Sequence, residues 1–326
     1  MDRYKIAFCG LGSIGKRHLR NTVKYLQEHH YDYQIDAVRS RAGAELPEDI
    51  VCHLTHTYSY ADEIPTDYDI IFITNPTSMH RECIERYCSN TKSMFIEKPL
   101  VDDINRHLDK LPPGLVCYVA CPLRYTRPLL YVKEHIECSR AYAVRAVCST
   151  YLPGWHPHED YRKSYSARRS MGGGVAIDLI HEWDYLIWLF GRPDSVTGIG
   201  RKVSELEIDS EDIAVYIGYT DKCVYELHLD YFGREEKRNF EIYLPGETIT
   251  VDLRGGNIRF SDGKKIDLRE DRNEYQEREI AHFFDIIRGV CENDNDIDDA
   301  MKTLKIAKGI SDGLGQDLLS SHLARC

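Results

Sequence analysis

The segment Gly10-Leu11-Gly12-Ser13-Ile14-Gly15 decides the fold of this 326-residue chain. It follows Tyr4–Cys9, an apolar run typical of a β-strand, and it precedes Lys16–His29, where apolar residues recur at helical spacing. A glycine pattern that closes a strand and opens a helix is far more specific than the same pattern alone. The segment therefore predicts a dinucleotide-binding βαβ unit.

Each part of the glycine segment has a physical task in such a unit. Gly10 permits the tight turn, Gly12 lets the backbone approach a pyrophosphate, and Gly15 allows the helix to pack closely on the strand. The helix then presents free N–H groups and the positive end of its dipole to the phosphates. We expect Ser13 and Ile14 at this end to contact the cofactor together with the three glycines.

The end of the second expected strand, Gln34–Val38, indicates which dinucleotide is bound. An NAD site prefers an acid there, to accept from the ribose 2′-hydroxyl, but the only nearby acid, Asp36, falls inside the strand. Arg39-Ser40-Arg41 follows instead, and a hydroxyl between two guanidiniums suits a 2′-phosphate. An ordinary basic turn is the alternative. We expect Arg39, Ser40 and Arg41 to select NADP(H) over NAD(H).

Strands and helices continue to alternate up to about residue 120. Tyr68–Thr74 and Ser93–Ile96 are expected strands, with a helix over His80–Cys88 between them. In a parallel sheet, ligands bind at the carboxyl ends of the strands. The loops at those ends, and the helix that follows the first of them, should supply further cofactor contacts from Asn75, Pro76, His80, Glu97 and Lys98.

The short sequence Glu97-Lys98-Pro99 places an amine at that edge. Proline cannot donate to a strand ladder and restricts the residue before it, so the strand should stop at Lys98. Taken alone, this tripeptide is better explained as a strand end with a solvated charge. The preceding glycine segment makes a functional lysine the better interpretation.

A second polar cluster lies in Val175–Phe190, which is apolar nearly all round and predicts a single buried helix. Asp178 and His181 are three positions apart, so they would share a face of that helix. Burying these polar side chains is costly unless they are hydrogen-bonded or take part in function. Two interpretations stay open: a core histidine hydrogen-bonded to the aspartate, and a functional pair. The preceding Gly172–Gly174 favours function, because backbone without side chains lets a ligand approach.

The rest of the chain, from about residue 195 to 260, is rich in β-type runs and predicts a mostly antiparallel sheet open on one face. We therefore expect an α/β protein of two domains. Residues 1–122 should form a doubly wound, dinucleotide-binding Rossmann domain, and residues 123–326 an α/β domain for substrate binding and oligomerisation. A broad exposed apolar face predicts self-association as a homodimer or homotetramer.

Composition restricts the remaining classes. A net charge of -11 argues against nucleic acid or an anionic membrane as the main partner. No apolar run approaches the ~20 residues of a membrane-spanning helix, and no signal peptide precedes the first strand. The eleven cysteines are scattered as singles, which suits free thiols in the cytoplasm, and no ligand spacing predicts a metal site.

Three motifs together resemble the Gfo/Idh/MocA oxidoreductase family: Gly10–Gly15, Glu97-Lys98-Pro99, and the glycine-rich entry to a helix carrying Asp178 and His181. The resemblance implies a Rossmann domain followed by an open-sheet domain, and NAD(P)-linked chemistry on sugars, inositols and polyols. It further implies that Lys98 is the active-site lysine, with a Lys98–Pro99 bond that is often cis, and that His181 is the catalytic histidine. One departure is the spacing, because the family's aspartate usually stands four residues before the histidine.

The leading hypothesis is hydride transfer between a nicotinamide and a sugar-like carbonyl or hydroxyl carbon, with Lys98 or His181 moving the proton and Asp178 orienting His181 or a substrate hydroxyl. The combination of Gly12–His18 with Tyr151–Tyr165 is similar to a branch found among bacterial surface-sugar and nonulosonate biosynthesis proteins, which points to a nucleotide-linked or acidic sugar. Two alternatives stay open: a non-catalytic NAD(P)-sensing regulator or scaffold, and a reductase of a non-sugar ring. Further substrate contacts are expected from Arg124, Trp155, Tyr161 and Arg162.

Overall fold

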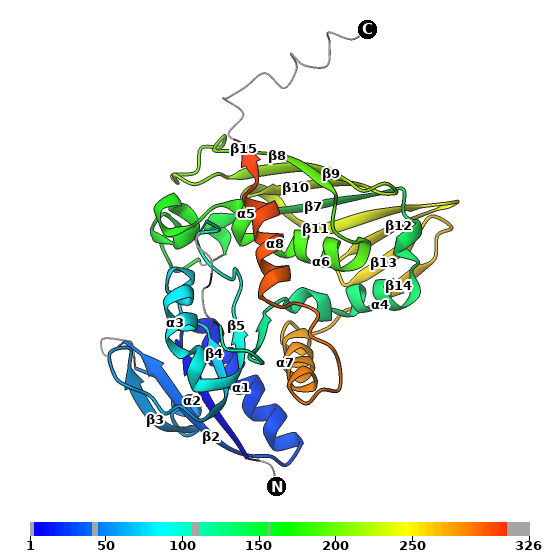
Figure 1. Ribbon diagram of the computed structural model, residues 1–326. Coiled ribbons are helices and arrows are strands. Elements are labelled where there is room, and N and C mark those ends of the chain that lie inside the picture. The colour runs from blue at the N-terminus through cyan, green and yellow to red at the C-terminus, as the bar shows by residue number, and fades with distance from the viewer. Residues whose placement is uncertain (1–2, 41–44, 106–107, 109–110, 156, 312–326) are drawn as a thin grey trace. The chain divides into compact units, whose positions relative to one another are not determined.

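The computed structural model describes residues 3–40, 45–105, 108, 111–155 and 157–311. The chain forms two compact units (Figure 1). The first spans Met1–Leu130 and Glu270–Leu304, and the second spans Tyr131–Arg269 and the residues from Lys305 onward. No helix among the described residues combines the length and the apolar composition needed to cross a membrane.

A six-stranded parallel sheet of order β3-β2-β1-β4-β5-β6 forms the centre of the first unit. The order reverses between β1 and β4, which confirms the predicted doubly wound Rossmann arrangement and places the ligand edge at the carboxyl ends of the strands. The strands are β1 (Arg3–Cys9), β2 (Asp32–Arg39), β3 (Leu54–Ser59), β4 (Tyr68–Ile73), β5 (Thr91–Ile96) and β6 (Val116–Val119).

Helices cover this sheet, and one of them returns from late in the sequence. Tyr25 of α1 stacks on Phe284 of α7 with 4.3 Å between ring centroids, and both belong to the core of the first unit. The observed units therefore differ from the expected division at residue 122, because the apolar face of α7 packs on α1. The helices are α1 (Ser13–Glu28), α2 (Glu48–Val51), α3 (His80–Tyr87) and α7 (Glu274–Ile287). Two more, α4 (Arg127–His135) and α8 (Ile297–Lys308), cross from one unit to the other.

The second unit contains a nine-stranded sheet of order β14-β13-β12-β11-β7-β10-β9-β8-β15. Only the β7–β10 and β8–β15 pairs are parallel, so the prediction of a mostly antiparallel sheet is confirmed. The strands are β7 (Ala143–Tyr151), β8 (Ser195–Arg201), β9 (Ile213–Tyr219), β10 (Val224–Asp230), β11 (Phe232–Leu244), β12 (Glu247–Asp252), β13 (Asn257–Phe260), β14 (Lys265–Asp267) and β15 (Ile310–Ser311).

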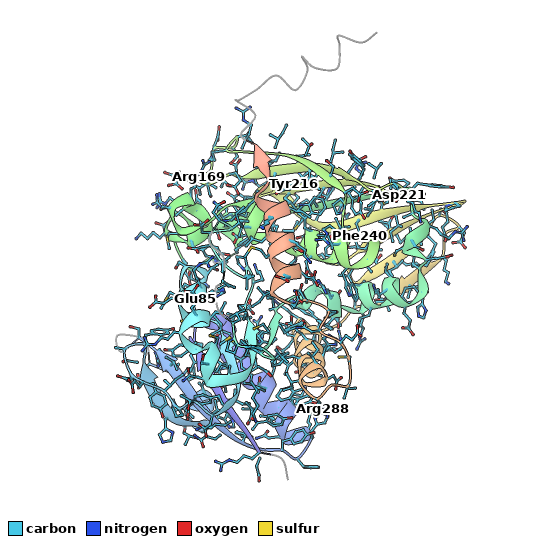
Figure 2. All side chains as sticks on the ribbon, in the orientation of Figure 1. Glu85, Arg169, Tyr216, Asp221, Phe240 and Arg288 are labelled. Atoms are coloured by element: carbon cyan, nitrogen blue, oxygen red, sulfur yellow. The ribbon has the colours of Figure 1, made fainter. Side chains whose placement is uncertain are left out.

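Helices cover one face of this second sheet, and the other face is open. Tyr216 and Phe240, both labelled in Figure 2, point to the covered face, where Trp183 meets Tyr216 edge to face with 5.4 Å between centroids. On β9 buried residues alternate with exposed or partly exposed ones, including Ile217 at 59% and Tyr219 at 54%. This alternation is what a sheet with one buried face requires.

The predicted single helix over Val175–Phe190 is wrong. The structure has two helices, α5 (Val175–Asp178) and α6 (His181–Phe190), separated by a turn at Leu179-Ile180. Apolar residues continue through that turn, so the hydrophobic pattern gave no sign of a break. Asp178 therefore ends one helix and His181 begins the next, and the two do not share the face of a continuous helix.

Candidate active site

The glycine loop of the first unit has the shape that a pyrophosphate requires. Gly10 has a φ of 99°, and a Cβ added to it would lie 2.6 Å from the backbone nitrogen of Asn75, so only glycine fits there. Gly12, by contrast, is exposed with open space where a Cβ would be. No side chain caps the N-terminus of α1, which leaves its first N–H groups to meet an anion. The loop therefore fits a dinucleotide.

The end of β2 carries Arg39 and Ser40 at the position where an NAD site usually has an acid. Asp36 is wholly buried within β2, where its carboxylate accepts from the hydroxyl of Tyr68 at 2.7 Å and meets Nδ1 of His56 at 3.2 Å. Arg39 ends the strand and lines a cavity of about 400 Å³ together with Glu45, and Ser40 next to Arg39 is exposed. Arg41 lies outside the described residues.

Glu97 connects the lysine turn to the helix of the glycine loop. It follows β5, and one of its carboxylate oxygens lies 2.5 Å from Nε2 of His18, a buried residue of α1. The other accepts the backbone N–H of Lys98 at 3.1 Å. Burial alone would raise the pKa of Glu97, but the hydrogen bond and charge of His18 outweigh it and hold that pKa below its usual value. Glu97 is therefore a carboxylate that fixes the turn, and His18, which the sequence analysis missed, is its partner.

His80 supports the same turn from the other side. Its Nδ1 lies 3.1 Å from the carbonyl oxygen of Pro99, and its Nε2 lies 2.9 Å from that of Asn75. The side chain is 1% exposed, and burial lowers its pKa. These contacts place His80 between the two loops. Lys98 itself is partly exposed beyond the end of β5, and its bond to Pro99 is cis.

In the second unit, Asp178 is held by two tyrosines. Its carboxylate is 4% exposed, and each oxygen accepts one phenol hydroxyl, from Tyr165 and from Tyr231. Tyr231 is wholly buried, whereas Tyr165 is 42% exposed. Burial, together with the charge of Asp178, raises the pKa of Tyr231 well above its usual value. Neither tyrosine was recognised as a partner from the sequence, because they lie 13 and 53 residues from Asp178.

The glycine run before α5 packs against a second carboxyl group. Gly174 has a φ of 137°, and a Cβ there would lie 2.0 Å from Oε1 of Glu211. Glu211 also accepts the backbone N–H of Ala176 in α5. Burial raises the pKa of Glu211, and the charge of Asp178 raises it further. The run is therefore explained at least in part by Glu211, which no sequence motif indicated.

The other expected substrate residues are dispersed. Trp155 donates from Nε1 to Oγ1 of Thr150 at 2.7 Å, and its ring meets that of Tyr231 edge to face at 5.5 Å. Arg162 is exposed and pairs with Asp160 and Glu207. The hydroxyl of Tyr161 accepts the backbone N–H of Glu207, and His181 is half-buried at the start of α6.

Arg124, another expected substrate residue, is buried and hydrogen-bonded to a neighbouring loop. It belongs to the first unit, is 4% exposed, and donates to the carbonyl oxygen of Asp294 at 2.9 Å and to the side chain of Asn295 at 3.3 Å. These bonds tie it to the loop before α8. Trp155, by contrast, is connected to the surroundings of Asp178 through its ring contact with Tyr231.

Comparison with known proteins identifies the family. The model described as "Oxidoreductase family, NAD-binding Rossmann fold" matches residues 4–112, and that described as "GFO/IDH/MocA C-terminal domain" matches residues 129–250. The chain belongs to the Gfo/Idh/MocA family. The two matches lie in succession along the chain, in the order that the sequence motifs predicted.

Individual members of the Gfo/Idh/MocA family are distant from this chain. The scyllo-inositol 2-dehydrogenase (NAD(+)) of Bacillus subtilis (strain 168) is 25% identical over 203 residues, which are 60% of this chain and 57% of that protein. The chain spans little more than half the length of the curated relatives it matches.

Solved structures are similar over nearly the whole fold. Levoglucosan dehydrogenase in complex with NADH and levoglucosan gives a TM-score of 0.78 at 17% identity, covering 95% of this chain and 96% of that chain. The WlbA dehydrogenase from Bordetella pertussis in complex with NADH and UDP-GlcNAcA gives a TM-score of 0.74 at 17% identity, covering 94% and 95%. At this identity the likeness establishes a shared fold.

Proposed function

We propose that this protein is an NADP(H)-dependent oxidoreductase that transfers a hydride to or from a carbonyl or hydroxyl carbon of a sugar-like substrate. The observation that carries the proposal is the position of Lys98 at the ligand edge of the first sheet, in a turn fixed by Glu97. A bound nicotinamide cofactor supplies the hydride chemistry. The protein has to orient the substrate and move one proton.

Lys98 in the first unit and His181 in the second are the proposed proton-transfer residues. Each carries a titratable nitrogen and is accessible to a ligand, since each is only partly buried. Asp178 is proposed to orient His181 or a substrate hydroxyl. Its carboxylate is buried and is hydrogen-bonded to two tyrosine hydroxyls.

The preference for the phosphorylated cofactor rests on the end of β2. Arg39 offers a guanidinium there, and Asp36 is committed to Tyr68 and His56 inside the sheet. A guanidinium at the position where an NAD site usually carries an acid favours a 2′-phosphate over a bare ribose hydroxyl. We therefore place NADP(H) ahead of NAD(H), although the two structural neighbours described above hold NADH.

The proposed substrate is a nucleotide-linked or acidic sugar. Support comes from the likeness to the WlbA dehydrogenase, whose structure holds UDP-GlcNAcA, and from exposed cations such as Arg162 and Arg169 in the irregular segment before α5. For the assembly we propose a homodimer or homotetramer that covers the open face of the second sheet, where Ile199, Ile217 and Tyr219 are exposed.

The first test is a titration of the purified protein with NADPH and, separately, with NADH, followed by nicotinamide fluorescence. Tighter binding of NADPH supports the assignment of Arg39 and leads to assays on scyllo-inositol, levoglucosan and UDP-linked sugars. Tighter binding of NADH rejects the 2′-phosphate argument. If neither dinucleotide binds, the proposed function is wrong and a scaffold becomes the better hypothesis.

The second test concerns the proton-transfer residues. Lys98→Met and His181→Ala should each lower turnover by roughly 100-fold or more while NADPH still binds, because general acid–base groups contribute about that much. Wild-type turnover in either variant would remove that residue from the mechanism.

A further inference from the structure

A cavity of about 430 Å³, here called the α1 cavity, lies beside the first turns of α1 in the first unit. Five of its six lining residues occupy positions i, i+3, i+4, i+7 and i+8 of that helix, so they share one face. The sixth comes from the segment before α7, which packs on α1 within the same unit (Figure 1). The lining residues are Ser13, Lys16, Arg17, Arg20, Asn21 and Asn273.

The lining of the α1 cavity is positive although the protein is acidic. Three of the six residues are cations, whereas the whole chain has a net charge of -11. The other three are neutral. Ser13 carries a hydroxyl, and Nδ2 of Asn273 donates to Oδ1 of Asn21 at 2.9 Å, so the two amides hold each other. The six lining residues therefore present positive charge and hydrogen-bond donors to an anion, with no carboxylate among them.

Two of the three cations have no anion beside them. Arg20 donates from Nε to Oδ2 of Asp49 at 2.6 Å. Within the part of the chain that the structure describes, neither Lys16 nor Arg17 has a salt-bridge or side-chain hydrogen-bond partner. Even the exposed Lys92 of the same unit is paired, with Asp69. Lys16 and Arg17 are partly buried, and a partly buried cation favours a counter-ion.

A phosphate group matches this lining in charge and in geometry. A phosphate monoester or inorganic phosphate carries nearly two negative charges and several acceptor oxygens. The guanidinium of Arg17 can bind two of these oxygens as a fork, and the ammonium of Lys16 adds a second positive charge. A carboxylate has one charge and would leave one cation unpaired. The volume of the α1 cavity also falls in the range of small-molecule sites, about 300–1,000 Å³.

The α1 cavity is distinct from the place expected for the pyrophosphate. That group is expected at Gly12 and Ser13, where α1 begins, whereas Lys16 and Arg17 lie about 5 Å farther along the helix axis. A ligand bound by these two side chains therefore needs a phosphate group in addition to a dinucleotide's pyrophosphate.

We propose that the α1 cavity is an anion subsite in which Lys16 and Arg17 bind a phosphate monoester or inorganic phosphate. Two sources supply that chemistry. One is the 2′-phosphate of NADP(H), and with this source the inference rests on the proposed function. The other is a separate phosphate-bearing molecule, which binds whether or not the protein takes a dinucleotide.

The experiment compares three proteins. The cavity variant combines Lys16→Gln with Arg17→Gln, because glutamine removes the charge and keeps a good helix former. The control combines Arg3→Gln with Lys92→Gln, which removes the same charge from exposed positions near the amino ends of β1 and β5. Thermal unfolding is measured with inorganic phosphate and with chloride at equal ionic strength, because non-specific attraction depends on salt. NADPH and NADH are titrated separately by nicotinamide fluorescence.

Each source predicts its own result. For a separate ligand, inorganic phosphate at several times its Kd should raise the unfolding midpoint of the wild type and the control by about 2–4 °C relative to chloride, and should not raise that of the cavity variant. For the cofactor, the cavity variant should bind NADPH roughly 10- to 100-fold more weakly than the control does, with NADH binding equal in the two. Either result supports the subsite and identifies its source.

Other results overturn the subsite. One is a phosphate effect that is equal in all three proteins, or absent from all three, together with unchanged NADPH binding. Another is an equal loss of NADPH and NADH binding without a phosphate effect, which would mean that the two cations act on the part common to both dinucleotides. If the wild type binds neither dinucleotide, yet phosphate stabilises it and not the cavity variant, the proposed function is wrong and the anion subsite is supported.

Discussion

Two buried carboxylates, Glu97 in the first unit and Asp178 in the second, stand beside proposed catalytic residues but are held in different ways. Glu97 is bonded to a histidine ring of α1 and to the backbone N–H of Lys98. Asp178 accepts hydrogen bonds from two side-chain hydroxyls, and one of these belongs to an exposed tyrosine. Glu97 thus fixes a backbone turn, whereas Asp178 connects to a group that a ligand can reach.

The two carboxylates should therefore respond differently to mutation of their neighbours. A carboxylate tied to backbone and to a buried ring cannot exchange its partners without disturbing the fold. A carboxylate tied to an exposed side chain can change its contacts when a ligand binds to that side chain. Changes near Glu97 should therefore affect stability first, and changes near Asp178 should affect turnover first.

Substitution of a glycine in the first unit gives the largest expected effect on stability and cofactor binding. In Gly10→Ala the new Cβ would meet the backbone of Asn75 at 2.6 Å, which cannot move aside, and the φ of 99° adds strain. We expect a loss of about 2–4 kcal/mol in the free energy of unfolding, with loss of NADPH binding. Thermal unfolding and fluorescence titration measure both effects.

Gly174→Ala is the matched control for Gly10→Ala. Its φ of 137° is also unfavourable, but the new Cβ would meet the carboxyl end of Glu211, which is a movable side chain. The expected loss is smaller, about 1–3 kcal/mol, and NADPH binding should persist. Equal losses of both stability and NADPH binding in the two variants would contradict the distinction.

Glu97→Gln should cost about 1.5–3 kcal/mol at neutral pH, because a charge-assisted bond to His18 becomes a neutral one. The sign of the pH effect follows from the lowered pKa of Glu97. The carboxylate stabilises the folded state fully above its unfolded pKa of about 4.5, and this stabilisation is lost as pH falls through the lower folded value. Urea unfolding should therefore show the two proteins converging in acid; a constant difference down to pH 3 would be evidence against the ion pair.

Arg39→Ala tests the cofactor proposal within the first unit. Loss of one guanidinium at a phosphate should weaken NADPH binding about tenfold, which is about 1.4 kcal/mol, and leave NADH binding unchanged. Arg3→Ala, at the opposite end of the strands, is the control and should alter neither. An equal loss for both dinucleotides would mean that Arg39 does not bind the 2′-phosphate.

The same contrast explains how much the sequence could predict. The turn at Gly10 and the position of Lys98 depend on local geometry, so motifs in single segments located them. The contact between His18 and Glu97 joins residues 79 positions apart, and that between Tyr231 and Asp178 joins residues 53 apart. No spacing rule covers such pairs. The edge strand β3 was missed for a different reason, because its exposed residues are polar and give no apolar pattern.

The break between α5 and α6 was missed because the segment is apolar on every side. A period of 3.6 residues identifies a helix by contrast between its faces, and Val175–Phe190 offers little contrast. The break has a functional consequence. It gives Asp178 a helix end, next to the glycine run and Glu211, and so allows two carboxyl groups to approach one another.

Glu211→Gln is the smallest expected effect and tests that approach directly. The folded pKa of Glu211 is raised, chiefly by burial and also by the charge of Asp178, so the folded state binds more protons than the unfolded one. Stability associated with this group is complete below the unfolded pKa of about 4.5 and falls as pH rises through the folded value. A neutral glutamine removes that loss and can still accept the N–H of Ala176.

We therefore expect the variant to be more stable than the wild type at pH 8, on the order of 1 kcal/mol, and no more stable at pH 4. A variant that is less stable at pH 8 would show that Glu211 stabilises α5 as a carboxylate, and that Asp178 does not oppose its charge.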